Sequence, residues 1–184
     1  MPSGPGPIAD ELIRTIAASV PPPVATFLLT SEQTAENIVA HHERTHTSTI
    51  QIVDELLGRE YAAIRAAVPQ VKLVQVIHVV GESSVDEAAE IAEHVDAILL
   101  DSGNPTLAVK ELGGTGRRHD WRLSRKIVET CGKPVFLAGG LNAENVREAI
   151  EVVQPFGLDI CSGVRTDGNL DLFKLERFIS AATN

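Results

Sequence analysis

From Val24 to the C-terminus, short apolar runs alternate with segments whose apolar residues recur at helical spacing. A nearly continuous run of Val, Ile and Leu is typical of a strand in a parallel sheet, since such strands are covered on both faces. This alternation predicts an α/β fold built from about six βα units, of the (β/α)8 TIM-barrel type. The expected strands are Val24 to Thr30, Thr49 to Asp54, Leu73 to Val79, Ala97 to Asp101, Val135 to Gly139 and Leu158 to Ser162.

The chain of 184 residues has the length of one domain. Residues 1–7 are rich in Pro and Gly and predict a disordered leader, and residues 8–184 a single phosphate-binding (β/α) barrel domain. A helix is expected over Glu11 to Val20, where three prolines end it. Helix-start signals follow at Ser31 to Thr34, at Ser83 and Ser84, and at Asn142.

Charge and cysteine usage exclude several classes of partner. The net charge of -9 would repel nucleic acid and anionic membranes, and no apolar run has the roughly 20 residues that span a bilayer. Cys131 and Cys161 form no CxxC motif, which suits a reducing compartment, so we expect a cytoplasmic protein. Cys131 is expected on the face of the barrel opposite the chemistry, and Cys161 in packing.

Active sites of parallel barrels form at the carboxyl ends of the strands, often with phosphate held after the last two. Gly139 and Gly140 end one expected strand, and Ser162 and Gly163 end the next, so both turns could present backbone N–H groups to an anion. The alternative is that these glycines only turn the chain. Asp101 ends another strand and is either a proton donor or a loop cap.

Histidines and arginines offer weaker candidates. We expect His41, His42 and His46 to be solvated side chains near a helix end, because their spacing matches no zinc motif. For His78 and His119 a structural role is favoured over contact with substrate. Arg117 and Arg118 follow a glycine-rich run and belong either to a solvated helix face or to an anion site.

Five motifs in register resemble phosphoribosylanthranilate isomerase of tryptophan biosynthesis. They are Leu99-Leu100-Asp101, Gly113-Gly114-Thr115-Gly116 with Asp120-Trp121, Leu137-Ala138-Gly139-Gly140-Leu141, Asn145-Val146, and Asp159 through Ser162-Gly163-Val164. The resemblance implies an Amadori rearrangement, in which an aminoaldose phosphate opens to a Schiff base and loses its C2′ proton to give an aminoketose. It implies a small phosphorylated sugar as substrate, and no metal or organic cofactor.

The resemblance also implies roles for particular residues. Asp101 would be the general acid that protonates the ribose ring oxygen. The backbones of Gly139, Gly140, Ser162 and Gly163 would hold the phosphate, and Gly114 and Gly116 would shape a loop over the substrate. Gln51, which matches the glutamine of the family's fourth strand, and Arg117 are further candidates for binding substrate.

This sequence departs from the family pattern near its start. The family opens with a strand bearing Lys-Ile-Cys-Gly, whose cysteine is the general base, and continues with a Ser-x-Arg loop; neither motif occurs in this chain. Residues Val24 to Thr30 match the family's third strand, so the barrel is expected to be incomplete at the N-terminus. Three readings follow: an isomerase, a sugar-phosphate-binding barrel without the base, or a sequence from which an upstream segment was left out.

An open sheet of six strands would expose two edges and part of its interior. We therefore expect a homo-oligomer. The helix predicted over Glu11 to Val20 is also a candidate to plug the gap.

Overall fold

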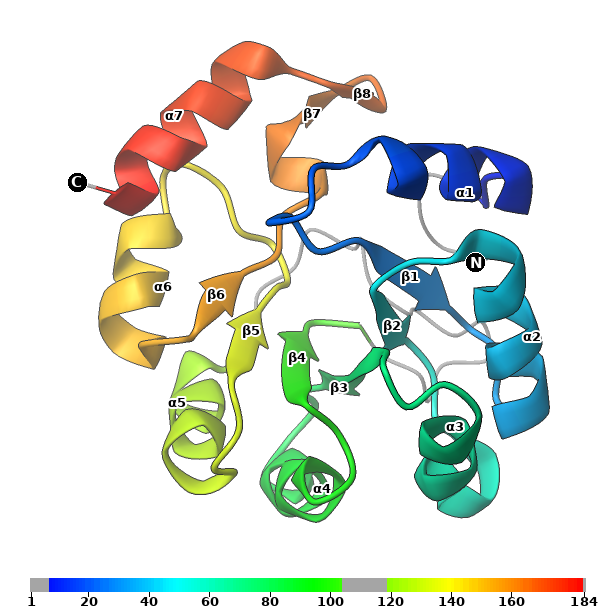
Figure 1. The fold of residues 1–184 in the computed structure, drawn as a ribbon. Coiled ribbons are helices and arrows are strands. Elements are labelled where there is room, and N and C mark those ends of the chain that lie inside the picture. The colour runs from blue at the N-terminus through cyan, green and yellow to red at the C-terminus, as the bar shows by residue number, and fades with distance from the viewer. Residues whose placement is uncertain (1–6, 104–118, 184) are drawn as a thin grey trace.

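The computed structural model describes residues 7–103 and 119–183. Its main feature is one sheet of six parallel strands in the order β1-β2-β3-β4-β5-β6, curled into most of a barrel and ringed by helices (Figure 1). The strands are β1 (Phe27–Thr30), β2 (Thr49–Ile52), β3 (Lys72–His78), β4 (Ala97–Asp101), β5 (Val135–Leu137) and β6 (Gly157–Leu158). The predicted TIM-barrel type of fold with six βα units is confirmed. Residues 1–6 of the predicted leader lie outside the described part.

Helices before, between and after the strands surround the sheet (Figure 1). They are α1 (Asp10–Ser19), α2 (Ala35–Thr45), η1 (Leu57–Arg59), α3 (Tyr61–Ala67), α4 (Ser83–Ala92), α5 (Trp121–Thr130), α6 (Val146–Val153), η2 (Ser162–Val164) and α7 (Leu172–Thr183). A short hairpin of β7 (Arg165–Thr166) and β8 (Asn169–Leu170) precedes α7. Among the described helices, none is long and apolar enough to cross a membrane.

Alternation along each strand divides the apolar residues between two clusters. Side chains such as Ile50, Leu73 and Ile98 pack with the helices in the larger core. Their neighbours, such as Val74 and Leu99, form a smaller cluster on the inner face. This inner face therefore carries the side chains that point into the curl of the sheet.

The open side of the curl explains one wrong prediction. We expected every strand to be buried on both faces, but Phe27 and Leu29 of β1 are 38% and 46% exposed. Among the described residues β1 has no strand beyond it, so its inner face lies open. The Phe27 ring nevertheless lies 6.3 Å from the Phe136 ring of β5, which shows how far the sheet curls.

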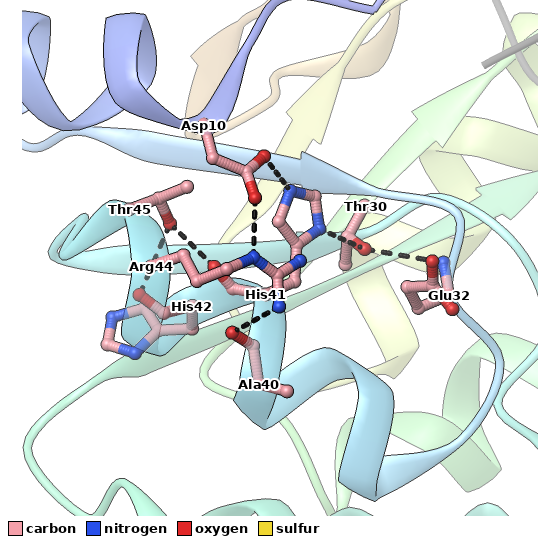
Figure 2. A network of polar contacts seen from close by, with 8 residues as sticks. All are labelled: Asp10, Thr30, Glu32, Ala40, His41, His42, Arg44 and Thr45. Carbon is pink, nitrogen blue, oxygen red and sulfur yellow. Dashed lines mark hydrogen bonds and ion pairs between the residues drawn. The ribbon is translucent and has the colours of Figure 1, made fainter.

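Helix α1 does not plug the gap, contrary to the prediction. Asp10 at its start accepts a hydrogen bond from Arg44 Nε at 2.5 Å and lies 3.3 Å from His41 Nε2, both on α2 (Figure 2). The Arg44 guanidinium lowers the pKa of the Asp10 carboxyl. These contacts hold α1 beside α2 in the outer ring of helices, where no α1 residue is buried (Figure 1).

Two of the three clustered histidines are packed, so the prediction of solvated groups was wrong for them. His41 Nδ1 lies 3.0 Å from Thr30 Oγ1, within the network of Figure 2. His42 is 6% exposed, with Nε2 2.8 Å from the carbonyl oxygen of Thr47. Only His46 of the three is exposed, and it ends α2 in the left-handed conformation.

Candidate functional site

Ionisable side chains gather on the inner face at the carboxyl ends of β3, β4 and β6. Strand register places His78 of β3 directly beside Asp101 of β4. Asp159 follows β6, and its N–H donates to the Leu137 carbonyl at 2.9 Å, which continues the β5–β6 ladder. The location matches the end of the sheet where parallel barrels carry their chemistry.

The Asp101 carboxyl is held in a form suited to acid catalysis. It is 8% exposed, and its Oδ1 accepts a hydrogen bond from the Ser102 N–H at 2.8 Å. Burial raises the pKa of Asp101, while the Ser102 N–H and His78 oppose that rise. A carboxyl with a raised pKa keeps its proton to higher pH and can donate it to a substrate.

Asp159 is a second carboxyl in the same region. The surrounding protein and the nearby Asp101 carboxylate raise the pKa of Asp159. Asp159 is exposed in the open curl of the sheet, so water screens its charge more than it screens the charge of Asp101. Because like charges oppose each other's ionisation, the two carboxyls favour a state in which one of them holds a proton.

Two histidines flank this end of the sheet. His78 Nε2 lies 3.1 Å from the Val53 carbonyl oxygen of the β2 segment. His119 Nε2 lies 2.7 Å from Ser124 Oγ at the start of α5, and burial lowers the pKa of His119 to about 4. His119 is therefore neutral at neutral pH and part of the α5 packing, in line with the structural role favoured for it.

The His119→Gln variant tests this assignment through stability. The unfolded histidine takes up a proton near pH 6.5 whereas the folded one does so only near 4, so stability is lost as pH falls below 6.5. We expect the wild type to lose roughly 2 kcal/mol of unfolding free energy between pH 7 and pH 5 through this group. Urea denaturation at both pH values should show a loss of unfolding free energy that is smaller by that amount in His119→Gln. An equal loss in the wild type and in His119→Gln would contradict the assignment.

The two glycine turns lie against each other. A Cβ atom on Gly163 would stand 2.0 Å from the Leu141 carbonyl oxygen, so the second turn packs directly on the backbone of the first. Gly140 has φ of +67° and its carbonyl accepts a hydrogen bond from Asn145 Nδ2 at 2.9 Å. The structure thus brings together the Gly139–Gly140 and Ser162–Gly163 turns that the sequence singled out.

Each turn also has a structural role. Gly139 has φ of +85°, and a Cβ there would stand 2.9 Å from the Ser102 backbone nitrogen, next to Asp101. Ser162 is exposed and begins η2, so the strand predicted to reach it ends earlier, at Leu158. Asn142 Oδ1 accepts from the N–H groups of Glu144 and Asn145, which fixes the turn before α6.

The remaining sequence candidates fall elsewhere. Gly114, Gly116 and Arg117 lie outside the described residues. Gln51 is buried in the middle of β2, paired with Leu29 and Val74, and so lies deeper in the sheet than Asp101. Within residues 7–103 and 119–183, no cluster of three His, Cys, Asp or Glu side chains has the arrangement of a metal site.

Sequence reasoning assigned no role to Asp159 and favoured a purely structural one for His78. A usable signal existed for Asp159, because it lies one residue beyond an apolar run at the same end of the sheet as Asp101. The position of His78 beside Asp101 depends on strand register, which no local pattern reveals.

Comparison with known proteins places this chain in a family. The family model described as N-(5'phosphoribosyl)anthranilate (PRA) isomerase matches residues 4–181. A relative from Methanosarcina mazei with the name N-(5'-phosphoribosyl)anthranilate isomerase 2 is 35% identical over 178 residues, covering 96% of this chain and 78% of the relative. A relative from Haloarcula marismortui, N-(5'-phosphoribosyl)anthranilate isomerase, is 35% identical over 89% of this chain and 72% of its own length.

Solved structures agree with the sequence relatives. Phosphoribosyl anthranilate isomerase from Thermotoga maritima superposes with a TM-score of 0.77 at 29% identity, over 95% of this chain and 80% of that one. A structure of the isomerase in complex with reduced 1-(o-carboxyphenylamino)-1-deoxyribulose 5-phosphate gives 0.74 at 27% identity, over 95% and 79%. The chain therefore belongs to the N-(5'-phosphoribosyl)anthranilate isomerase family.

Proposed function

We propose that this protein isomerises N-(5'-phosphoribosyl)anthranilate in tryptophan biosynthesis, with Asp101 as the general acid. The observation that carries the proposal is the buried Asp101 carboxyl with its raised pKa, at the carboxyl end of β4. Relatives that share most of the chain carry the name of this isomerase. The residues and the family therefore point to the same chemistry.

The proposed reaction is an intramolecular redox change with no cofactor. The Asp101 O–H gives its proton to the ribose ring oxygen as the C1′–O bond breaks, which leaves a Schiff base and an Asp101 carboxylate. A base then removes the C2′ proton, and the resulting enolamine becomes the aminoketose. C1′ is thereby reduced and C2′ oxidised. The protein contributes acid catalysis and the binding that orients the sugar.

The two packed turns are the proposed phosphate-binding site. Gly139 and Gly140 follow β5, and Ser162 and Gly163 lie in η2 after β6, where backbone N–H groups can approach an anion. The turns hold each other in place through the Gly163–Leu141 contact, so little ordering would remain for binding. Gly114, Gly116, Arg117 and Gln51 remain proposals from sequence.

A second proposed function is sugar-phosphate binding without turnover, because the two packed turns can bind an anion whether or not a base acts on the bound molecule. A binding measurement and a turnover measurement therefore separate the two functions.

The deciding experiment adds the anthranilate-linked aminoribose phosphate to purified protein and follows the loss of its fluorescence. Calorimetric titration with the reduced 1-(o-carboxyphenylamino)-1-deoxyribulose 5-phosphate measures binding in parallel. Isomerase activity predicts both fluorescence loss and binding. Binding without fluorescence loss would establish the second function. Absence of both would mean that the two turns have only a structural role.

Location and assembly follow as further proposals. The two free cysteines and the expectation of a reducing compartment support a cytoplasmic protein. The exposed Phe27 and Leu29 on the edge strand β1 support a homo-oligomer that covers them.

A further inference from the structure

We propose that Asp159 is a specificity-determining residue, whose carboxylate accepts hydrogen bonds from the C2′ and C3′ hydroxyls of a bound pentose phosphate. The inference rests on the proposed function, because it orients the sugar by the acid and the phosphate-binding turns described above. It follows from strand register, from the face of the sheet that each side chain occupies, and from the shape of a five-membered sugar ring.

Asp159 ends a row of residues that crosses three strands. Register pairs Leu100 of β4 with Leu137 of β5, and Leu137 with Leu158 of β6. One residue further along, the Ala138 N–H donates to the Leu100 carbonyl at 2.8 Å. The Asp159 N–H likewise donates to the Leu137 carbonyl at 2.9 Å, so the ladder continues. The next row of the sheet therefore consists of Asp101, Ala138 and Asp159.

All three side chains of this row lie on the inner face of the sheet. Ala138 belongs to the smaller cluster on that face, as do the β4 residues two and four positions before Asp101. On β6, a Cβ atom at Gly157 would stand 2.7 Å from the ring of Phe136, which packs against the same cluster. Asp159 lies two residues beyond Gly157 and therefore takes the same side.

The row leaves room for a sugar between two carboxyls. Neighbouring strands lie about 4.8 Å apart, so Asp101 and Asp159, which are two strands apart, are separated by about 9–10 Å along the sheet. The residue between them is alanine, whose methyl group is short and apolar. A pentose ring can therefore lie over Ala138 with one carboxyl at each side.

The turns and the acid determine which edge of the sugar faces Asp159. The phosphate-binding turns lie beyond the row, since Gly139 comes directly after Ala138 and Ser162 comes three residues after Asp159. The proposed acid Asp101 faces the ring oxygen. In a five-membered sugar ring this oxygen and the C2′–C3′ bond are on opposite sides. The C2′–C3′ edge therefore points away from Asp101 and toward Asp159.

The Asp159 carboxyl is suited to these hydroxyls. Asp159 is exposed in the open curl of the sheet, so a ligand can reach it. Burial and Asp101 raise the pKa of Asp159, and the Ile160 N–H opposes that rise. Hydroxyls that donate to the carboxylate would oppose it further, because such bonds favour the ionised form. In ribose the C2′ and C3′ hydroxyls lie on the same face of the ring, so one carboxylate can accept from both.

Titration of two sugars into three proteins, followed by protein NMR, tests this inference. The sugars are ribose 5-phosphate and 2-deoxyribose 5-phosphate, and the proteins are the wild type, Asp159→Ala and Asp86→Ala. We expect the wild type to bind ribose 5-phosphate roughly 10- to 100-fold more tightly, as is usual for a hydrogen bond to a charged group. Asp159→Ala should lower this ratio to less than about threefold. Asp86→Ala, on the exposed side of α4, should keep the wild-type ratio.

The ratio of the two affinities is the quantity compared, because a general change in the site weakens both sugars alike. Equal affinity of the wild type for both sugars, or the wild-type ratio in Asp159→Ala, would overturn the inference. Absence of binding of either sugar to the wild type would also overturn it. A preference for ribose 5-phosphate that depends on Asp159, without fluorescence loss in the turnover assay, would support the inference and contradict the isomerase activity alone.

Discussion

Asp101→Asn is expected to lower kcat for isomerisation by about 100- to 10,000-fold, the usual contribution of a positioned general acid. The carboxamide has nearly the shape of the carboxyl and its oxygen can still accept from the Ser102 N–H. It has no acidic proton for the ribose ring oxygen. Binding of the reduced product analogue should change far less than kcat, because the phosphate turns are intact.

Asp86→Asn is the matched control for this experiment. Asp86 is exposed in the first turn of α4, on the helix side of the sheet, so its loss of charge should leave kcat unchanged. Fluorescence decay of the substrate measures the rate in each protein. A kcat for Asp101→Asn within threefold of the wild-type value would show that Asp101 is not the general acid.

Gly163→Ala is expected to disrupt the proposed phosphate-binding site. The new Cβ would stand 2.0 Å from the Leu141 carbonyl oxygen, a backbone atom that cannot rotate away. One of the two turns must move, at a cost of about 1–3 kcal/mol, which is the usual range for overpacking. The displaced N–H groups should weaken binding of the phosphorylated analogue by more than tenfold.

Gly81→Ala provides the comparison, since a Cβ at Gly81 would meet nothing within 4 Å. Urea denaturation measures the stability of both variants, and calorimetry measures their affinity for the analogue. Gly163→Ala with wild-type stability and affinity would mean that the two turns do not hold each other. A loss of stability with unchanged affinity would place the phosphate elsewhere.

Much of the fold could be predicted because each strand leaves a local apolar pattern. The strand at Ala97–Asp101 was predicted with its observed bounds, and the first helix within one residue at each end. Strand ends were less predictable where glycine changes the backbone. The fifth strand stops at Leu137 instead of continuing to Gly139, whose φ of +85° cannot extend a strand. The exposed inner face of β1 depends on what lies beside the strand, which its own residues do not encode.

The site was only partly predictable for the same reason. Asp101 could be found because it ends an apolar run, and the glycine pairs because they stand in the sequence as pairs. The contact of Gly163 with Leu141 and the pairing of His78 with Asp101 join segments far apart in the chain. They arise from register and curvature of the sheet, so only the folded arrangement reveals them.

The measurement that tests the proposed chemistry most directly is proton NMR of the reaction in D2O. An Amadori rearrangement removes the substrate's C2′ proton and places a solvent deuteron on C1′ as the enolamine becomes the ketone. The purified 184-residue chain should therefore produce an aminoketose with one deuterium at C1′, faster than a sample without protein. If the substrate disappears no faster with the protein than without it, the result would contradict the proposal that this family member is an isomerase.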